Sequence, residues 1–93
     1  MTQKKGYTVS RNENETLSVF IKATGLGYEA KYWYVRKDAE TIIEYRSQHF
    51  HGKNKHDAVY RTLKFAESEL SERKVRKVQE LLQNAWSLLE PIL

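Results

Sequence analysis

Residues 16–36 read TLSVFIKATGLGYEAKYWYVR, and this stretch decides the fold. Apolar side chains alternate along both halves of it, and β-branched and aromatic residues are frequent, which is typical of β-strands. Gly25-Leu26-Gly27 lies between the halves, where glycines favour a tight hairpin turn. The stretch therefore predicts two antiparallel strands, residues 16–23 and 28–36, joined by that turn.

Further strands are predicted on both sides of this hairpin. Residues 7–11 form a short first strand, which the polar segment 12–15 brings to an end. Residues 41–49 follow a turn at 37–40 and complete a meander of three or four strands. Residues 1–6 are expected to be a disordered tail.

Near residue 54 the apolar period changes from two residues to three or four, which indicates helices. Asn54 followed by Asp57 is close to a capping box and predicts a first helix over 54–70. A second helix is predicted over 72–90. Ser71 either caps this second helix or faces solvent within one long helix. An apolar seam spaced as in a coiled coil runs along the second helix and comprises Val75, Val78, Leu82, Ala85, Leu89 and Ile92.

The expected architecture is one α+β domain over residues 1–93, with an antiparallel meander sheet followed by two C-terminal helices. The seam either completes its core or pairs two copies in a homodimer. The chain has no Cys, which excludes a disulfide scaffold and thiol catalysis. No apolar run is long enough to span a membrane, and residues 1–6 lack the apolar core of a secretory signal, so we expect a cytoplasmic protein without a membrane partner.

The alternation sorts the side chains of the strands into two faces. The more apolar face is expected in the core and comprises Leu17, Val19, Ile21, Tyr28, Ala30, Tyr32, Tyr34, Ile43 and Tyr45. The other is expected to meet solvent and comprises Phe20, Lys22, Lys31, Trp33, Val35, Ile42, Glu44, Arg46 and Gln48. Aromatic rings framed by cations can stack on bases and hold phosphates. The alternative is that the second helix covers Trp33 and Phe20 and leaves the sheet sandwiched.

The predicted start of the first helix is also basic. Lys53, Lys55 and His56 surround it, and the N-terminus of a helix attracts phosphate. In the alternative interpretation, Asn54 and Asp57 only cap the helix and the lysines are solvated.

The sequence gives little support to metal or catalytic chemistry. His49 and His51 precede His56-Asp57, but no further ligand group is evident, so we expect no metal and no cofactor. Paired carboxylates and nucleotide-binding loops are lacking as well, so we expect no catalytic residues and no enzyme.

Two family resemblances follow from these residues. The run from Gly52 to Ala58 resembles the second-helix entrance of double-stranded RNA-binding domains, which implies that Lys55 and His56 clamp phosphates. Residues 28–70 are similar to the arm-site DNA-binding domains of tyrosine-recombinase integrases. That resemblance implies a sheet laid in the major groove with a helix behind it, and the residues facing DNA would be Lys31, Trp33, Arg46 and Gln48.

The predicted function is noncatalytic binding of nucleic acid, either DNA or RNA. The predicted contact residues are Lys22, Lys31, Trp33, Arg46, Gln48, Lys53, Lys55 and His56. The alternative is a protein-interaction module, antitoxin-like or a phage-type inhibitor, that binds a protein partner through Trp33 and the tyrosines. Interface cores favour Tyr, Trp and Arg, in which this chain is rich. A looser likeness to ribonuclease-H-like antitoxins, with Ala23 where a nuclease needs Asp, belongs to this alternative.

Overall fold

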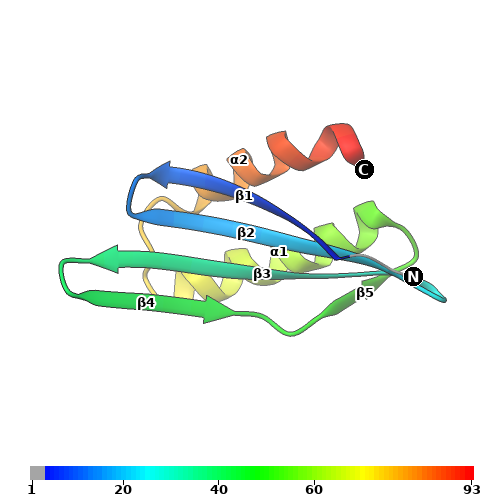
Figure 1. The fold of residues 1–93 in the computed structure, drawn as a ribbon, viewed down its shortest axis with the longest axis horizontal. Helices are drawn as coiled ribbons and strands as arrows, with labels where there is room; N and C mark the ends of the chain where they lie inside the picture. Colours follow the sequence, from blue (N-terminus) through cyan, green and yellow to red (C-terminus); the bar gives the residue numbers. More distant parts are fainter. Residues whose placement is uncertain (1–3) are drawn as a thin grey trace.

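A computed structural model describes residues 4–93 and shows an α+β fold in which two helices pack on one face of a five-stranded sheet (Figure 1). The strands are β1 (Lys4–Asn12), β2 (Glu15–Thr24), β3 (Gly27–Asp38), β4 (Thr41–Arg46) and β5 (Phe50–Gly52). The helices are α1 (Lys55–Glu72), α2 (Val78–Leu89) and the short 3-10 helix η1 (Glu90–Ile92). β1 to β4 form an antiparallel meander in sequence order, and β5 pairs with β3. The predicted fold class is confirmed.

The hairpin at the centre of the sheet is the one that the sequence predicts. β2 and β3 pair without a register shift from Glu15 opposite Arg36 to Thr24 opposite Gly27. Gly25 and Leu26 form the turn, and the Thr24 hydroxyl accepts a hydrogen bond from the Leu26 N–H at 3.3 Å.

The first strand begins earlier than the sequence indicates. Lys5 lies opposite Ile21 and Gly6 opposite Phe20, so residues 4–6 belong to β1 and not to a tail. β2 is long enough to offer pairing partners to the residues that precede Tyr7, and residues 4–6 of β1 pair with them. Residues 1–3 of the predicted tail lie outside the described residues.

The predicted strand 41–49 is interrupted at 47–49, where three residues stand opposite two of β3. Ser47 compensates for the missing strand pairing, because it forms hydrogen bonds with both the backbone N–H and the backbone carbonyl of Tyr32. The Tyr32 N–H donates to the Ser47 hydroxyl at 2.9 Å, and the Ser47 N–H donates to the Tyr32 carbonyl at 3.1 Å. The extra residue acts as a bulge, after which β5 resumes the pairing with Phe50 opposite Ala30.

The second helix begins at Val78, six residues later than predicted. α1 runs through Ser71 to Glu72, so Ser71 neither stops it nor caps α2. A loop of residues 73–77 follows, in which Lys74 and Lys77 adopt left-handed backbone angles with φ of 60° and 54°. This conformation ends a right-handed helix, and Val75, which lies between these two lysines in the chain, is buried in the core.

A single core lies between the helices and the face of the sheet that was predicted to be apolar. Tyr32 and Tyr34 are fully buried in it, and Tyr28 and Tyr45 are half-buried against it. Ile43 is half-buried on β4. The predicted seam completes this core from Val75 to Leu89, whose seam residues are buried within the chain, whereas its last member, Ile92, is 37% exposed. Within residues 4–93, none of the helices combines the length and the apolar character that a membrane crossing requires.

Candidate nucleic-acid interface

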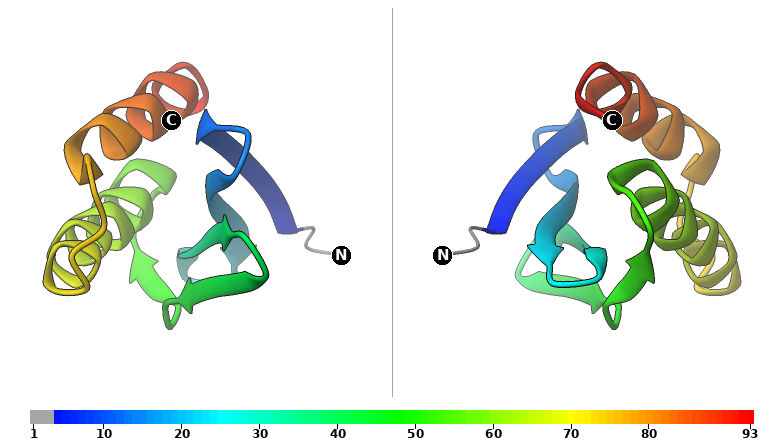
Figure 2. Two further views of the ribbon diagram at one scale, coloured as in Figure 1. Left: turned by 90° about the vertical axis from the view of Figure 1, so that its left-hand side faces the viewer. Right: turned by 90° about the vertical axis from the view of Figure 1, so that its right-hand side faces the viewer.

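The face of the sheet that carries Phe20 and Trp33 has no helix on it in the described part of the chain. Both helices lie on the opposite side, as the two end views show (Figure 2). Side chains alternate along β3, so Tyr32 and Tyr34 point into the core while Trp33 between them points away and stays partly exposed. The interpretation in which the second helix covers Trp33 is therefore wrong. We call this surface the open face; its main side chains are Phe20, Lys22, Lys31, Trp33, Glu44 and Arg46.

Two aromatic rings and two cations form a cluster on the open face. The rings of Phe20 on β2 and Trp33 on β3 are stacked, with centroids 6.4 Å apart and an interplanar angle of 28°. The guanidinium carbon of Arg46 lies 4.6 Å from the Trp33 ring centroid, and the Lys31 ammonium lies 5.9 Å from that of Phe20. Strand register explains this arrangement, because Lys31 is opposite Phe20 and Arg46 is opposite Trp33.

A carboxylate fixes the orientation of the indole. The Trp33 Nε1–H donates a hydrogen bond to Glu44 Oε1 at 3.2 Å, and the same oxygen lies 3.8 Å from an Arg46 terminal nitrogen. Glu44 and Arg46 are exposed, so their ion pair contributes little to stability. The pair instead sets the geometry, because Glu44 Oε1 contacts both the indole N–H and the Arg46 guanidinium, which lies over the indole ring.

These side chains border a shallow cavity of about 160 Å³, lined by Phe20, Lys31, Tyr32, Trp33 and Arg46. That volume corresponds to about five water molecules in the liquid. Complete sites for small molecules usually measure 300 Å³ or more. The cavity therefore suits one planar ring of a larger ligand better than a whole free metabolite.

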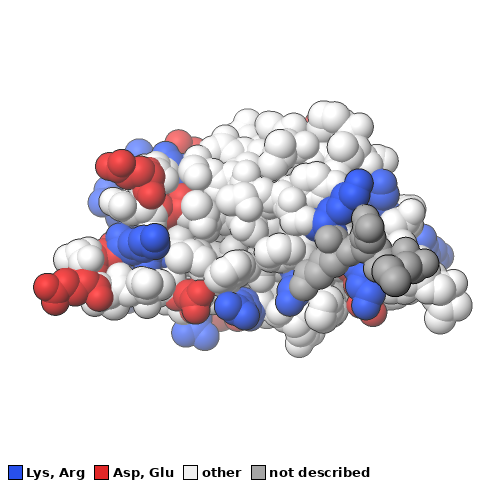
Figure 3. Space-filling view, in the orientation of Figure 1, with Lys and Arg blue, Asp and Glu red and all other residues white. Residues whose placement is uncertain are grey.

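The other predicted residues of the sheet lie outside this cluster. Lys22 is exposed on β2 opposite Glu29. Gln48 is exposed in the interruption between β4 and β5, and not on a continuous strand as predicted. In the space-filling view of this side, the charged side chains gather at the two ends and along the lower edge, and the middle is largely uncharged (Figure 3).

The structure separates Lys53, Lys55 and His56 from the open face, because α1 lies on the other side of the sheet. The Lys55 ammonium lies 5.9 Å from the ring centroid of the half-buried Tyr28. The His56 ring packs against Trp86 of α2, with centroids 5.7 Å apart. Of the eight predicted contact residues, these three form a group of their own.

The N-terminus of α1 is also occupied by its own side chains. Asn54 Oδ1 accepts a hydrogen bond from the Asp57 N–H at 2.8 Å, which is the predicted cap. Asp57 accepts one from the Lys53 N–H at 3.3 Å and lies 3.5 Å from Arg61. A carboxylate already lies where a phosphate would bind, so this end is a poor anion site.

Sequence reasoning missed a second basic region at the turn end of the sheet. There a cavity of about 430 Å³ is lined by residues from three separate segments, including Arg11, Arg36, Lys74 and Arg76. The signal in the sequence is the run RKVRK at 73–77, which lies within the predicted second helix. No group of three His, Asp or Glu side chains among residues 4–93 is placed to hold a metal ion.

Comparisons with protein-family models, curated proteins and solved structures find no match to this chain. The resemblances to double-stranded RNA-binding and integrase arm-site domains stay predictions from short motifs.

Proposed function

We propose that this protein is a noncatalytic domain that binds single-stranded nucleic acid on its open face, in the cytoplasm. The observation that supports this most is the uncovered Phe20–Trp33 pair with Lys31 and Arg46 beside its rings. Bases stack on aromatic rings and on guanidinium groups, and cations at the rim hold the phosphates. In this proposal one base occupies the 160 Å³ cavity, and Lys22, Lys31 and Arg46 contact the backbone.

The composition of the open face favours a single strand over a duplex. The flat surfaces of bases are hidden inside a duplex, so an aromatic platform reaches them only where bases are unstacked. Binding along a duplex backbone needs many cations, whereas here Glu29 lies opposite Lys22 and Glu44 contacts Arg46. Lys53, Lys55 and His56 are left out of this proposal because they lie on the helix side.

The protein-interaction alternative requires exposed tyrosines, and two of the tyrosines of β3 are not exposed. Tyr32 and Tyr34 are fully buried, whereas Tyr60 is 47% exposed on α1. Tyrosines that form the core cannot contact a partner. We therefore favour nucleic acid as the ligand.

Salt dependence tests the proposal. Fluorescence anisotropy with a labelled strand of about 12 nucleotides would measure the affinity of the wild type between about 50 and 200 mM salt. Lys31→Ala and Arg46→Ala should each reduce the slope of log affinity against log salt by about 0.7, the value for one phosphate contact on a single strand. Lys64→Ala removes a cation from the outer side of α1, 60% exposed, and should leave the slope unchanged.

Two results would contradict the proposal. One is a duplex of the same sequence that binds as tightly as the single strand. The other is the absence of binding to any single strand at the lowest salt concentration, which would return the protein-partner alternative to first place.

A further inference from the structure

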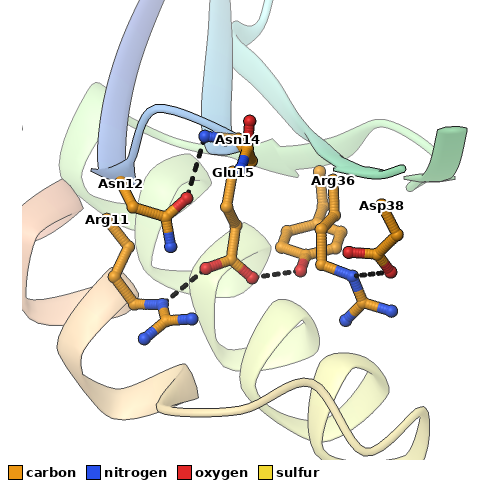
Figure 4. A network of polar contacts seen from close by, with 7 residues as sticks. Arg11, Asn12, Asn14, Glu15, Arg36 and Asp38 are labelled. Carbon is orange, nitrogen blue, oxygen red and sulfur yellow. Dashed lines mark hydrogen bonds and ion pairs between the residues drawn. The ribbon is translucent and has the colours of Figure 1, made fainter. Parts of the chain in front are cut away.

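A second cavity lies where the β1–β2 turn, the β3–β4 turn and the loop of residues 73–77 meet, and its volume is about 430 Å³. We call it the end cavity. Every residue in its wall is polar or charged, with five cations against two carboxylates. Figure 4 shows the residues that the turns of the sheet contribute. The wall is formed by Arg11, Asn12, Asn14, Glu15, Arg36, Lys37, Asp38, Lys74 and Arg76.

The two carboxylates in this wall already have partners. Glu15 is only 1% exposed and accepts hydrogen bonds from Arg11 Nε and from the Tyr34 hydroxyl. Burial, together with the hydrogen bond to Glu15, raises the pKa of Tyr34, which keeps its hydroxyl protonated as a donor. Asp38 accepts from Arg36 Nε at 2.9 Å. Each carboxylate thus offsets one guanidinium.

The remaining positive charge has no such partner. Arg11 and Arg36 bind their carboxylates through Nε, and their terminal nitrogens extend from the sheet toward the loop of residues 73–77 (Figure 4). The side chains of Lys37, Lys74 and Arg76 form no ion pair or hydrogen bond with any residue in the described range 4–93. The cavity therefore holds an excess of cationic donors.

Backbone contacts hold the wall in place before any ligand arrives. The Lys37 N–H donates to the Asn14 carbonyl at 2.8 Å, which joins the two turns. On the opposite side, the Val75 N–H donates to the Leu70 carbonyl at 2.9 Å, and the Val75 side chain is buried. Because the turns and the loop are fixed, binding costs less conformational entropy than it would with mobile segments.

We propose that the end cavity binds a compact oligophosphate. Its volume lies in the range of small-molecule sites, but such sites are mostly apolar, and this wall offers no aromatic or aliphatic side chain for a base. Guanidinium groups match phosphate oxygens in pairs, and the cationic excess suits a ligand with several negative charges. Free oligophosphate and the phosphorylated end of a nucleotide or strand share this chemistry. Arg36 has the same side-chain orientation as the core residues of β3, so the cavity lies on the helix side and is independent of the open face.

Calorimetric titration of the full chain with inorganic tripolyphosphate tests this proposal. The double variant Lys74→Asn/Arg76→Ala should bind at least tenfold more weakly than the wild type. Asparagine is chosen because it tolerates the left-handed backbone of Lys74. The matched control, Arg61→Ala/Lys64→Ala, removes the same charge from exposed positions of α1 and should change the affinity less than twofold. Equal weakening by both double variants would show attraction to net charge alone and overturn the proposal, as would a wild type that releases no heat of binding.

Two further measurements distinguish a free phosphate ligand from a nucleic-acid end, and the end cavity from the open face. A nucleoside triphosphate that binds as tightly as tripolyphosphate indicates a free ligand, whereas tighter binding of a 5′-triphosphorylated strand indicates a nucleic-acid end. Trp33→Ala should leave tripolyphosphate binding intact. If it abolishes that binding without unfolding the chain, the end cavity is not the site.

Discussion

Trp33→Ala is expected to weaken the binding of a single strand by about 30-fold, because stacking of one base on an aromatic ring contributes roughly 2 kcal/mol. The substitution removes one wall of the 160 Å³ cavity and the ring beneath Arg46. It should leave the fold in place, since Trp33 lies on the side of the sheet opposite the core. Anisotropy titrations against the same labelled strand measure the affinity, and circular dichroism of the variant verifies the fold.

Trp86 supplies the control for this experiment. It lies between α1 and α2 beside His56 and Tyr60, on the far side of the sheet. Trp86→Phe should preserve the affinity and leave Trp33 as the one indole, whose fluorescence should fall when a base stacks on it. A Trp33→Ala variant that binds like the wild type, or an indole signal that the strand does not change, would exclude the open face as the binding surface.

The pattern of alternation predicted which side chains share a face, and the helices cover the more apolar of the two faces, as expected. Val35, Ile42 and Trp33 are apolar enough to be buried, so hydrophobicity alone left both arrangements open. The structure resolves this through the tyrosines. Tyr32 and Tyr34 are fully buried, and each hydroxyl is satisfied by a carboxylate, from Glu69 and Glu15 respectively. A partner so distant in sequence could not be inferred from a local pattern.

The breaks in regular structure were also beyond local patterns. β4 ends before Ser47, whose hydroxyl accepts the hydrogen bond from the Tyr32 N–H in place of a strand carbonyl. This contact depends on the register of β3. The loop of residues 73–77 interrupts a sequence that has helical periodicity, and the left-handed Lys74 and Lys77 are not residues that usually adopt that conformation. The end cavity was missed for the same reason, because this loop brings Lys74 and Arg76 to the turns of the sheet.

Gly52→Ala is expected to lower the free energy of unfolding by about 3 kcal/mol, a large effect for one methyl group. A Cβ at this position would lie 2.3 Å from the backbone nitrogen of Ala58 and 2.8 Å from the carbonyl carbon of Asp57. Both atoms belong to the backbone of the first turn of α1, which cannot move aside as a side chain can. Gly52 also pairs with Tyr28, so α1 must shift away from the sheet or β5 must unpair. Urea denaturation of the variant measures the loss.

Gly25→Ala is the matched comparison, because a Cβ at Gly25 would meet no atom within 4 Å. Its free energy of unfolding should stay within about 1 kcal/mol of the wild type, since alanine in a turn mainly reduces the freedom of the unfolded chain. Gly27, like Gly52 and unlike Gly25, has no room for a side chain, because a Cβ there would lie 2.3 Å from the Gly52 carbonyl oxygen. Its φ of 148° also favours glycine. The start of β3, β5 and the first turn of α1 thus meet where two residues lack side chains. Equal stability of the Gly52 and Gly25 variants would show that α1 does not approach the sheet this closely.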